Sequence, residues 1–200
     1  MNEFRRPEVL LFDVMSTLVY DPFFIEVPAH FQMTFKELIS NKNTDAWPAF
    51  EKNEISESEF FALFFGDGRI VDGEAMRQCM FDNYRFLDGI EMLLKELMEK
   101  NCTMYSLSNY PIWYQMIEAK LHLERFMDWR FVSCRTGVRK PDPQAYLIPS
   151  KTLEVSPKQC LFIDDRADNC AAAIAVGMSA IQYRSTEQLR EELTQYGVLS

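Results

Sequence analysis

Two apolar runs in this chain end in carboxylates, and this pattern constrains the fold more than any other feature. The first run is Val9–Phe12, followed by Asp13, and the second is Leu161–Ile163, followed by Asp164 and Asp165. Short continuous apolar runs are typical of strands buried in a parallel sheet. Ligands bind at the carboxyl ends of such strands, so we expect the carboxylates to meet there. Crowded carboxylates repel one another and commonly share a divalent cation such as Mg²⁺.

The remaining pattern alternates between strands and helices. Besides a strand at 8–13, we expect strands at 102–107, 130–133, 160–163 and 180–183, and helices at 88–101, 111–121, 168–176 and 186–196. Asp88 is the expected N-cap of the first of these helices, and Pro111 the expected first residue of the second. Such alternation predicts an α/β fold with a doubly wound parallel sheet, covered by helices on both faces.

The segment 21–86 differs from the rest of the chain. It is rich in phenylalanine and has no alternating strand pattern, but Ser56 and Glu59 form a capping-box signature that predicts a helix start. We therefore predict a core made of residues 1–20 and 87–200, with a small helical cap at 21–86 inserted after the first strand. Most of its aromatic residues are expected to pack these short helices together.

Composition excludes several classes of protein. The net charge of −9 disfavours nucleic acid and anionic membranes as partners, and no apolar stretch reaches the roughly 20 residues that span a bilayer. Two histidines make a Ser-His-Asp triad or a His-rich zinc site improbable. Five cysteines without a C-x-x-C pair predict free thiols. We expect a soluble intracellular protein, cytoplasmic or, if a transit peptide was removed, in a plastid.

Four motifs in order resemble those of the haloacid dehalogenase-like hydrolase superfamily. They are Phe12–Leu18, Leu107–Asn109, Gly137–Tyr146, and Phe162–Asp165 with its continuation to Met178. The resemblance covers nearly the whole chain and implies a Rossmann-like core, with the helical insert as the cap of this family. Further similarity in Asp21–Phe23 and Asn109–Tyr114 points to the plant and algal branch that includes a plastid FMN phosphatase.

The resemblance implies a catalytic set. Asp13 is expected to attack phosphorus and form an aspartyl-phosphate, which water then hydrolyses. Ser108 is expected to donate a hydrogen bond to the phosphoryl group, and Lys140 to neutralise its charge and restrain Asp13. Asp165 is expected to orient a ligand, water or Lys140. Together these roles predict hydrolysis of the phosphate ester of a small phosphorylated metabolite.

The metal site and the substrate slot are also implied. Mg²⁺ is expected on Asp13, Asp164 and the backbone carbonyl of Met15, the position at which related phosphatases carry an acid–base aspartate. Neither Met15 nor Ser16 can transfer a proton at neutral pH, a loss that typically costs on the order of 10²–10⁴ in rate. Asn109 is a further candidate for substrate binding, and an aromatic slot for a flavin is expected from Phe23, Trp47, Tyr110 and Trp113.

Three functions therefore stay open. The first is a Mg²⁺-dependent phosphatase with FMN as the best single substrate, and the second is a catalytically weak or inactive binding or regulatory protein on the same scaffold. The third is a 2-haloacid dehalogenase. Such enzymes also lack the second aspartate but need no metal, whereas the Asp164-Asp165 pair favours a metal site. The sequence does not indicate an oligomeric state.

Overall fold

The computed structural model describes residues 6–199 and is built around a five-stranded sheet in which all strands are parallel. The strand order is β3-β2-β1-β4-β5. The strands are β1 (Val9–Phe12), β2 (Thr103–Ser108), β3 (Asp128–Val132), β4 (Cys160–Asp164) and β5 (Ser179–Gln182). Each overlaps a strand predicted from the sequence, because each is a short apolar run between polar segments.

Helices cover both faces of the sheet, as predicted. Leu10 and Phe12 of β1 join a large core with helices that include α6 (Ile90–Glu99) and α11 (Thr186–Gln195). Val9 and Leu11 point to the other face and join a second core with α9 (Pro143–Thr152) and α10 (Ala167–Ala175). This alternation is the period-2 geometry of a strand buried on both sides.

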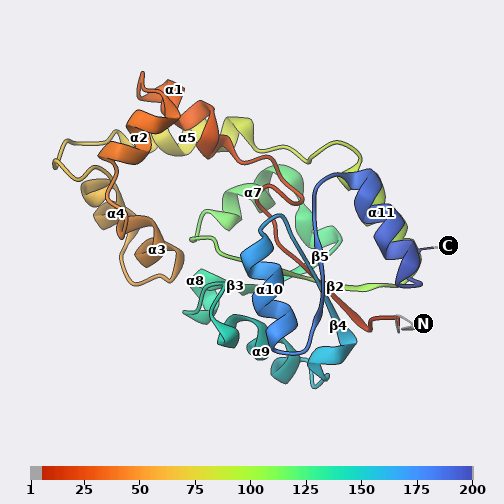
Figure 1. Ribbon diagram of the computed structural model, residues 1–200. Coiled ribbons are helices and arrows are strands. Elements are labelled where there is room, and N and C mark those ends of the chain that lie inside the picture. Colours follow the sequence, from red (N-terminus) through yellow and green to blue (C-terminus); the bar gives the residue numbers. More distant parts are fainter. Residues whose placement is uncertain (1–5, 200) are drawn as a thin grey trace.

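Helices also fill the segment between β1 and α6, in agreement with the prediction of a helical insert. They are η1 (Pro22–Phe24), α1 (Glu26–His30), α2 (Phe35–Asn41), α3 (Ala46–Glu51), α4 (Glu57–Leu63) and α5 (Gly73–Asn83). Figure 1 shows α1–α5 gathered at one end of the molecule, away from the two termini. The predicted Ser56–Glu59 capping box opens α4.

The boundaries of core and cap stay a prediction. Buried residues of the insert, such as Phe60 and Met76, belong to the same hydrophobic cluster as Leu94 beneath the sheet. The hydrophobic core is therefore continuous between the two parts. Residues 1–5 and Ser200, which the predicted core segments include, lie outside the described residues.

Local signals were less accurate than the strand pattern. The N-cap of α6 is Gly89, in the left-handed region with φ 76°, and not Asp88. The helix after β2, α7 (Tyr114–Leu121), begins after Pro111, which lies in the preceding turn. Helix α9 was not predicted, although Asp142 caps it and Pro143 opens it. The remaining short helices are η2 (Leu123–Arg125), α8 (Ser133–Thr136) and η3 (Pro157–Gln159).

Two sequence-level expectations have simple outcomes. All five cysteines are free thiols. Across residues 6–199, no helix is both long enough and apolar enough to pass through a bilayer.

Candidate active site

The three carboxylates predicted to meet do meet, at the carboxyl edge of the sheet. β1 and β4 are neighbours, and the backbone N–H of Asp13 donates to the Ile163 carbonyl at 2.8 Å, which extends the pairing by one residue. Asp164 is the last residue of β4, and Asp165 follows it. Carboxylate oxygens of Asp13, Asp164 and Asp165 lie within 4.8 Å of one another.

Lys140 lies between two of these acids. Its Nζ donates to Asp13 Oδ1 at 2.8 Å and to Asp164 Oδ2 at 2.6 Å, and its side chain is only 2% exposed. The lysine lies in the loop between α8 and α9. There the side-chain amide of Asn109 forms hydrogen bonds with both the backbone carbonyl and the backbone N–H of Lys140. Asn109 donates to the Lys140 carbonyl at 2.8 Å and accepts from its N–H at 2.7 Å. The predicted loop setting of Lys140 is thus confirmed.

Burial and charge together set the protonation of this cluster. Burial raises the pKa of Asp13 to about 7, with Asp164 adding to the rise and Lys140 opposing it. Burial and the neighbouring Asp164 also raise the pKa of Asp165. Burial by itself lowers the pKa of Lys140, but its ion pairs with Asp13 and Asp164 outweigh that effect and raise it. Three carboxylates face one ammonium, so the fully ionised cluster carries two uncompensated negative charges, which suits a divalent cation.

A tight turn follows Asp13 and positions Thr17. The turn closes on the Val14 carbonyl, and Ser16 within it adopts the left-handed region with φ 60°. Thr17 is fully buried and donates from Oγ1 to Asp13 Oδ2 at 3.4 Å. The same oxygen accepts from the backbone N–H of Asp165 at 3.1 Å. Thr17 thereby ties the two predicted catalytic segments together, a role that the sequence analysis did not assign.

Asp164 is held by the start of α10. The Asn169 side-chain amide donates to both carboxylate oxygens, at 3.1 and 3.0 Å, and the backbone N–H of Arg166 donates to Oδ1 at 2.8 Å. These hydrogen bonds fix the orientation of the Asp164 carboxyl group. Asn169 was part of the fourth motif but had no predicted role, and its position five residues after Asp164 is the only signal that could have indicated one.

Ser108, at the end of β2, has an unused hydroxyl. Within residues 6–199, its Oγ is the only fully buried side-chain nitrogen or oxygen atom without a hydrogen-bond partner. Buried hydroxyls nearly always have a partner, so such an exception calls for an explanation. A ligand oxygen at the carboxyl edge of the sheet is the partner that the predicted role of Ser108 requires.

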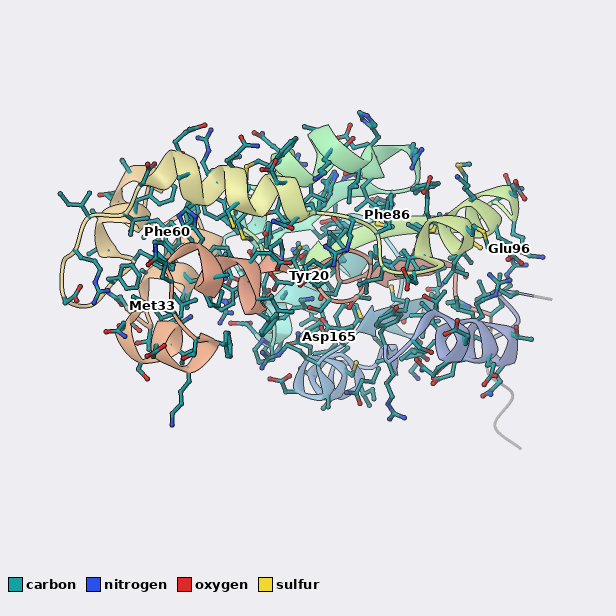
Figure 2. The ribbon with its side chains drawn as sticks, turned by 90° about the horizontal axis from the view of Figure 1, so that it is seen from above. Tyr20, Met33, Phe60, Phe86, Glu96 and Asp165 are labelled. Atoms are coloured by element: carbon teal, nitrogen blue, oxygen red, sulfur yellow. The ribbon has the colours of Figure 1, made fainter. Side chains whose placement is uncertain are left out.

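A pocket of about 250 Å³ lies over the cluster, between the sheet and the helical insert. Figure 2 shows Asp165 where the end of the molecule that holds Met33 and Phe60 meets the rest of the chain. The lining residues are Asp13, Met15, Ser16, Asp21, Phe24, Glu51, Asn109, Arg139, Lys140, Pro141, Asp165, Arg166, Asp168 and Asn169. Met15, predicted to offer its carbonyl to the metal, is therefore part of the wall.

One contact across this pocket joins the insert to the loop of Lys140. Arg139 Nε donates to Glu51 Oε2 at 2.8 Å, and the buried Glu51 carboxylate also accepts from Trp47 Nε1 at 2.6 Å. Ser133 Oγ donates to the Glu51 carbonyl at 2.6 Å. Arg139 and Glu51 are 88 residues apart in the sequence, so no local pattern could have indicated this pair.

The predicted aromatic slot lies mainly beside this pocket. Phe23, Trp47, Tyr110 and Trp113 line a separate apolar cavity of about 80 Å³. Tyr110 and Trp113 are buried, and Trp47 packs edge-on against both of them. The structure thus gives these side chains packing contacts, and their role in substrate binding stays a prediction. The exposed aromatic residue that lines the larger pocket is Phe24, which is 51% exposed.

Sequence comparisons show which known proteins this chain is similar to. A sequence profile of the haloacid dehalogenase-like hydrolases matches residues 8–177. Flavin mononucleotide hydrolase 1 of Arabidopsis thaliana, a chloroplast protein by its name, is 43% identical over 97% of this chain and 79% of its own length. A sesquiterpene phosphatase of Aspergillus oryzae is 27% identical over 82% of this chain and 85% of its own.

Among solved structures, the fold is similar to a haloacid dehalogenase-family enzyme of Bacteroides thetaiotaomicron in complex with magnesium. The TM-score is 0.74 at 20% identity, over 94% of this chain and 99% of that one. This likeness supports the observed arrangement of parallel sheet and flanking helices.

Proposed function

The chain belongs to the haloacid dehalogenase-like hydrolase family, and we propose that it is a Mg²⁺-dependent phosphomonoesterase that hydrolyses flavin mononucleotide (FMN). The observation that carries the proposal is the buried Lys140 ammonium held between Asp13 and Asp164, with the unpartnered Ser108 hydroxyl on the adjoining strand. The proposed substrate follows the name of the Arabidopsis relative. If this chain acts where that relative's name places it, it acts in a chloroplast.

The residues present fit a magnesium ion. Asp13 and Asp164 are proposed as carboxylate ligands and Met15 as a carbonyl ligand, a small oxygen set of the kind Mg²⁺ prefers. The two uncompensated negative charges of the cluster support this assignment. When bound there, Mg²⁺ would neutralise negative charge on a phosphoryl group.

Each remaining step is assigned to a side chain of this site. Asp13 attacks phosphorus, a phosphorus–oxygen bond forms to its carboxylate, and the bond to the leaving ester oxygen breaks. Lys140 keeps Asp13 in position and neutralises charge that develops on the phosphoryl oxygens. Ser108 donates a hydrogen bond to one of those oxygens. Asp165, fixed through its N–H to Thr17, orients the attacking water in the second step.

FMN recognition is proposed to use Phe24 in place of the predicted slot. The cavity among Trp47, Tyr110 and Trp113 holds about 80 Å³, whereas the pocket over Asp13 holds about 250 Å³ and is open to a larger ligand. Phe24 instead presents an exposed ring on the wall of the pocket that contains Asp13. A flavin ring stacked on Phe24 would leave its phosphate free to reach the carboxyl edge of the sheet.

A binding or regulatory protein is the second candidate, because neither Met15 nor Ser16 supplies the usual acid–base group. The two functions differ in turnover. A protein that only binds would show a thermal shift with FMN and no phosphate release, whereas a phosphatase would release phosphate and lose this activity with the Asp13→Asn substitution. Dehalogenase activity, the third expectation, would appear as halide release that EDTA leaves unchanged.

The deciding experiment is a phosphate-release screen with MgCl₂ over flavin, sugar and nucleotide monophosphates. We expect FMN to be the preferred substrate, EDTA to abolish turnover, and Asp13→Asn to be inactive. Asp168→Asn is the matched control, because Asp168 lines the same pocket but is exposed and paired with Arg166 at 2.8 Å. Absence of turnover on every ester, or equal turnover by Asp13→Asn, would overturn the proposal.

A further inference from the structure

The pocket over Asp13 contains an acid to which the mechanism above assigns no role. Asp21 lines the same cavity of about 250 Å³ as Asp13 and Met15, although it comes from the loop that leads into the helical insert. Asp21 is thus a candidate to act on the ester oxygen that departs from the side opposite Asp13.

The other unassigned acids of the pocket are engaged in ion pairs. Glu51 is bound by Arg139 Nε at 2.8 Å, and Asp168 is paired with Arg166 at 2.8 Å. In the described part of the chain, Asp21 forms no ion pair. Its Oδ1 accepts from the backbone N–H of Phe23 at 2.9 Å, which caps η1 and fixes the direction of the carboxyl group.

The surroundings of Asp21 suit proton transfer. Burial raises the pKa of Asp21 to about 6, and the negative charges of Asp165 and Glu26 add to this rise, while the hydrogen bond from Phe23 opposes it. The cations that line the same pocket, Arg139, Lys140 and Arg166, are each paired with another acid. A general acid–base works best when its pKa lies near the working pH, because both protonation states are then populated.

We propose that Asp21 is the general acid–base of this enzyme and replaces the acid that is absent at positions 15 and 16. The inference rests on the proposed phosphatase function. As Asp13 attacks phosphorus, the bond to the ester oxygen breaks, and that oxygen takes the proton of the Asp21 carboxyl and leaves as an alcohol. Water then attacks the aspartyl-phosphate and gives a proton to the Asp21 carboxylate. The bond from phosphorus to Asp13 breaks, and inorganic phosphate and the free Asp13 carboxylate are released.

The test compares leaving groups in the Asp21→Asn variant. Asparagine keeps one oxygen for the Phe23 N–H, so the η1 cap is retained, but it cannot donate a proton as an acid does. The alkoxide of FMN needs protonation, whereas p-nitrophenolate leaves without it. We expect release of riboflavin from FMN to slow on the order of 10²–10⁴-fold. The initial burst of p-nitrophenolate should change by only a few-fold, followed by a slow steady state because the second step also lacks its base.

Three comparisons decide the result. Equal slowing of riboflavin release and of the p-nitrophenolate burst, or no slowing of either, would overturn the role of Asp21. If the wild type hydrolyses p-nitrophenyl phosphate and Asp13→Asn does not, the phosphatase function is supported whatever the role of Asp21. If the wild type shows no turnover, both proposals are overturned. Asp21→Ser, which also offers a capping oxygen, replaces the asparagine variant if that variant does not fold. Asp128→Asn is the control that should match the wild type, because Asp128 is exposed, paired with Arg130 at 3.1 Å and not part of this pocket.

Discussion

Replacing the proposed nucleophile should make the metal-free protein more stable. Asp13 is buried beside Asp164 and Asp165, and this environment raises its pKa from 3.8 to about 7 despite Lys140. One pKa unit corresponds to about 1.4 kcal/mol, so the ionised carboxylate costs at most about 4 kcal/mol of stability above pH 7. An asparagine side chain has nearly the same shape without the charge. Since about 1 kcal/mol shifts the melting temperature of a domain of this size by about 2–4 °C, we expect a rise of several degrees for Asp13→Asn.

The pH dependence follows from the direction of the shift. A carboxyl whose folded pKa lies above its unfolded pKa takes up its proton more readily in the folded state, so stability falls as pH rises from 3.8 through about 7. The gain from Asp13→Asn should therefore be absent near pH 4 and complete above pH 7. Magnesium should reverse the order, because it binds the wild-type carboxylates and stabilises the folded state by mass action.

Thermal melts followed by circular dichroism measure both effects, in EDTA and in MgCl₂, between pH 4 and pH 8. Asp168→Asn provides the control, since this exposed acid is paired with Arg166 and should change the melting temperature little. An Asp13→Asn variant that melts at or below the wild-type temperature in EDTA at pH 8 would refute the reasoning. It would show that the carboxylates at this edge do not destabilise the metal-free fold.

Three further substitutions test the other parts of the site. Lys140→Met leaves the carboxylates of Asp13 and Asp164 buried without their cation, so thermal melts in EDTA should show a loss of about 3–5 kcal/mol, and phosphate release should stop. Ser108→Ala removes a hydroxyl that has no partner, so stability should be unchanged while kcat falls about 10²-fold; unchanged kcat would contradict the assigned role. Phe24→Ala removes an exposed ring, so KM for FMN should rise about 10-fold while KM for a sugar phosphate stays constant, as steady-state assays on both substrates would show.

Much of the core could be predicted because its signals are local. β1 and β4 are short apolar runs, and a strand buried on both faces needs such a run whatever lies around it. The carboxylates that end them were expected to meet because parallel strands present their carboxyl ends at one edge. The weaker predictions depended on single residues. For example, the N-cap of α6 is Gly89 and not Asp88, because the chain adopts a left-handed conformation there that favours glycine.

The wall of the pocket could not be predicted in the same way. Its members come from the insert and from the loop before α9, and the Glu51–Arg139 pair links segments that share no sequence pattern. The aromatic residues illustrate the same limit. Phe24 and Trp113 are both aromatic, but packing buries Trp113 and leaves Phe24 exposed on the pocket.

The sequence by itself determined the parallel α/β core, the order of its motifs, and the absence of an acid at positions 15 and 16. These follow from apolar periodicity and from residue identity, which are properties of the chain alone. The tertiary structure decided that Lys140 bridges Asp13 and Asp164, and that Asp21 shares their pocket. The physical reason is that burial, pKa and the identity of a charged partner arise only when distant segments pack together.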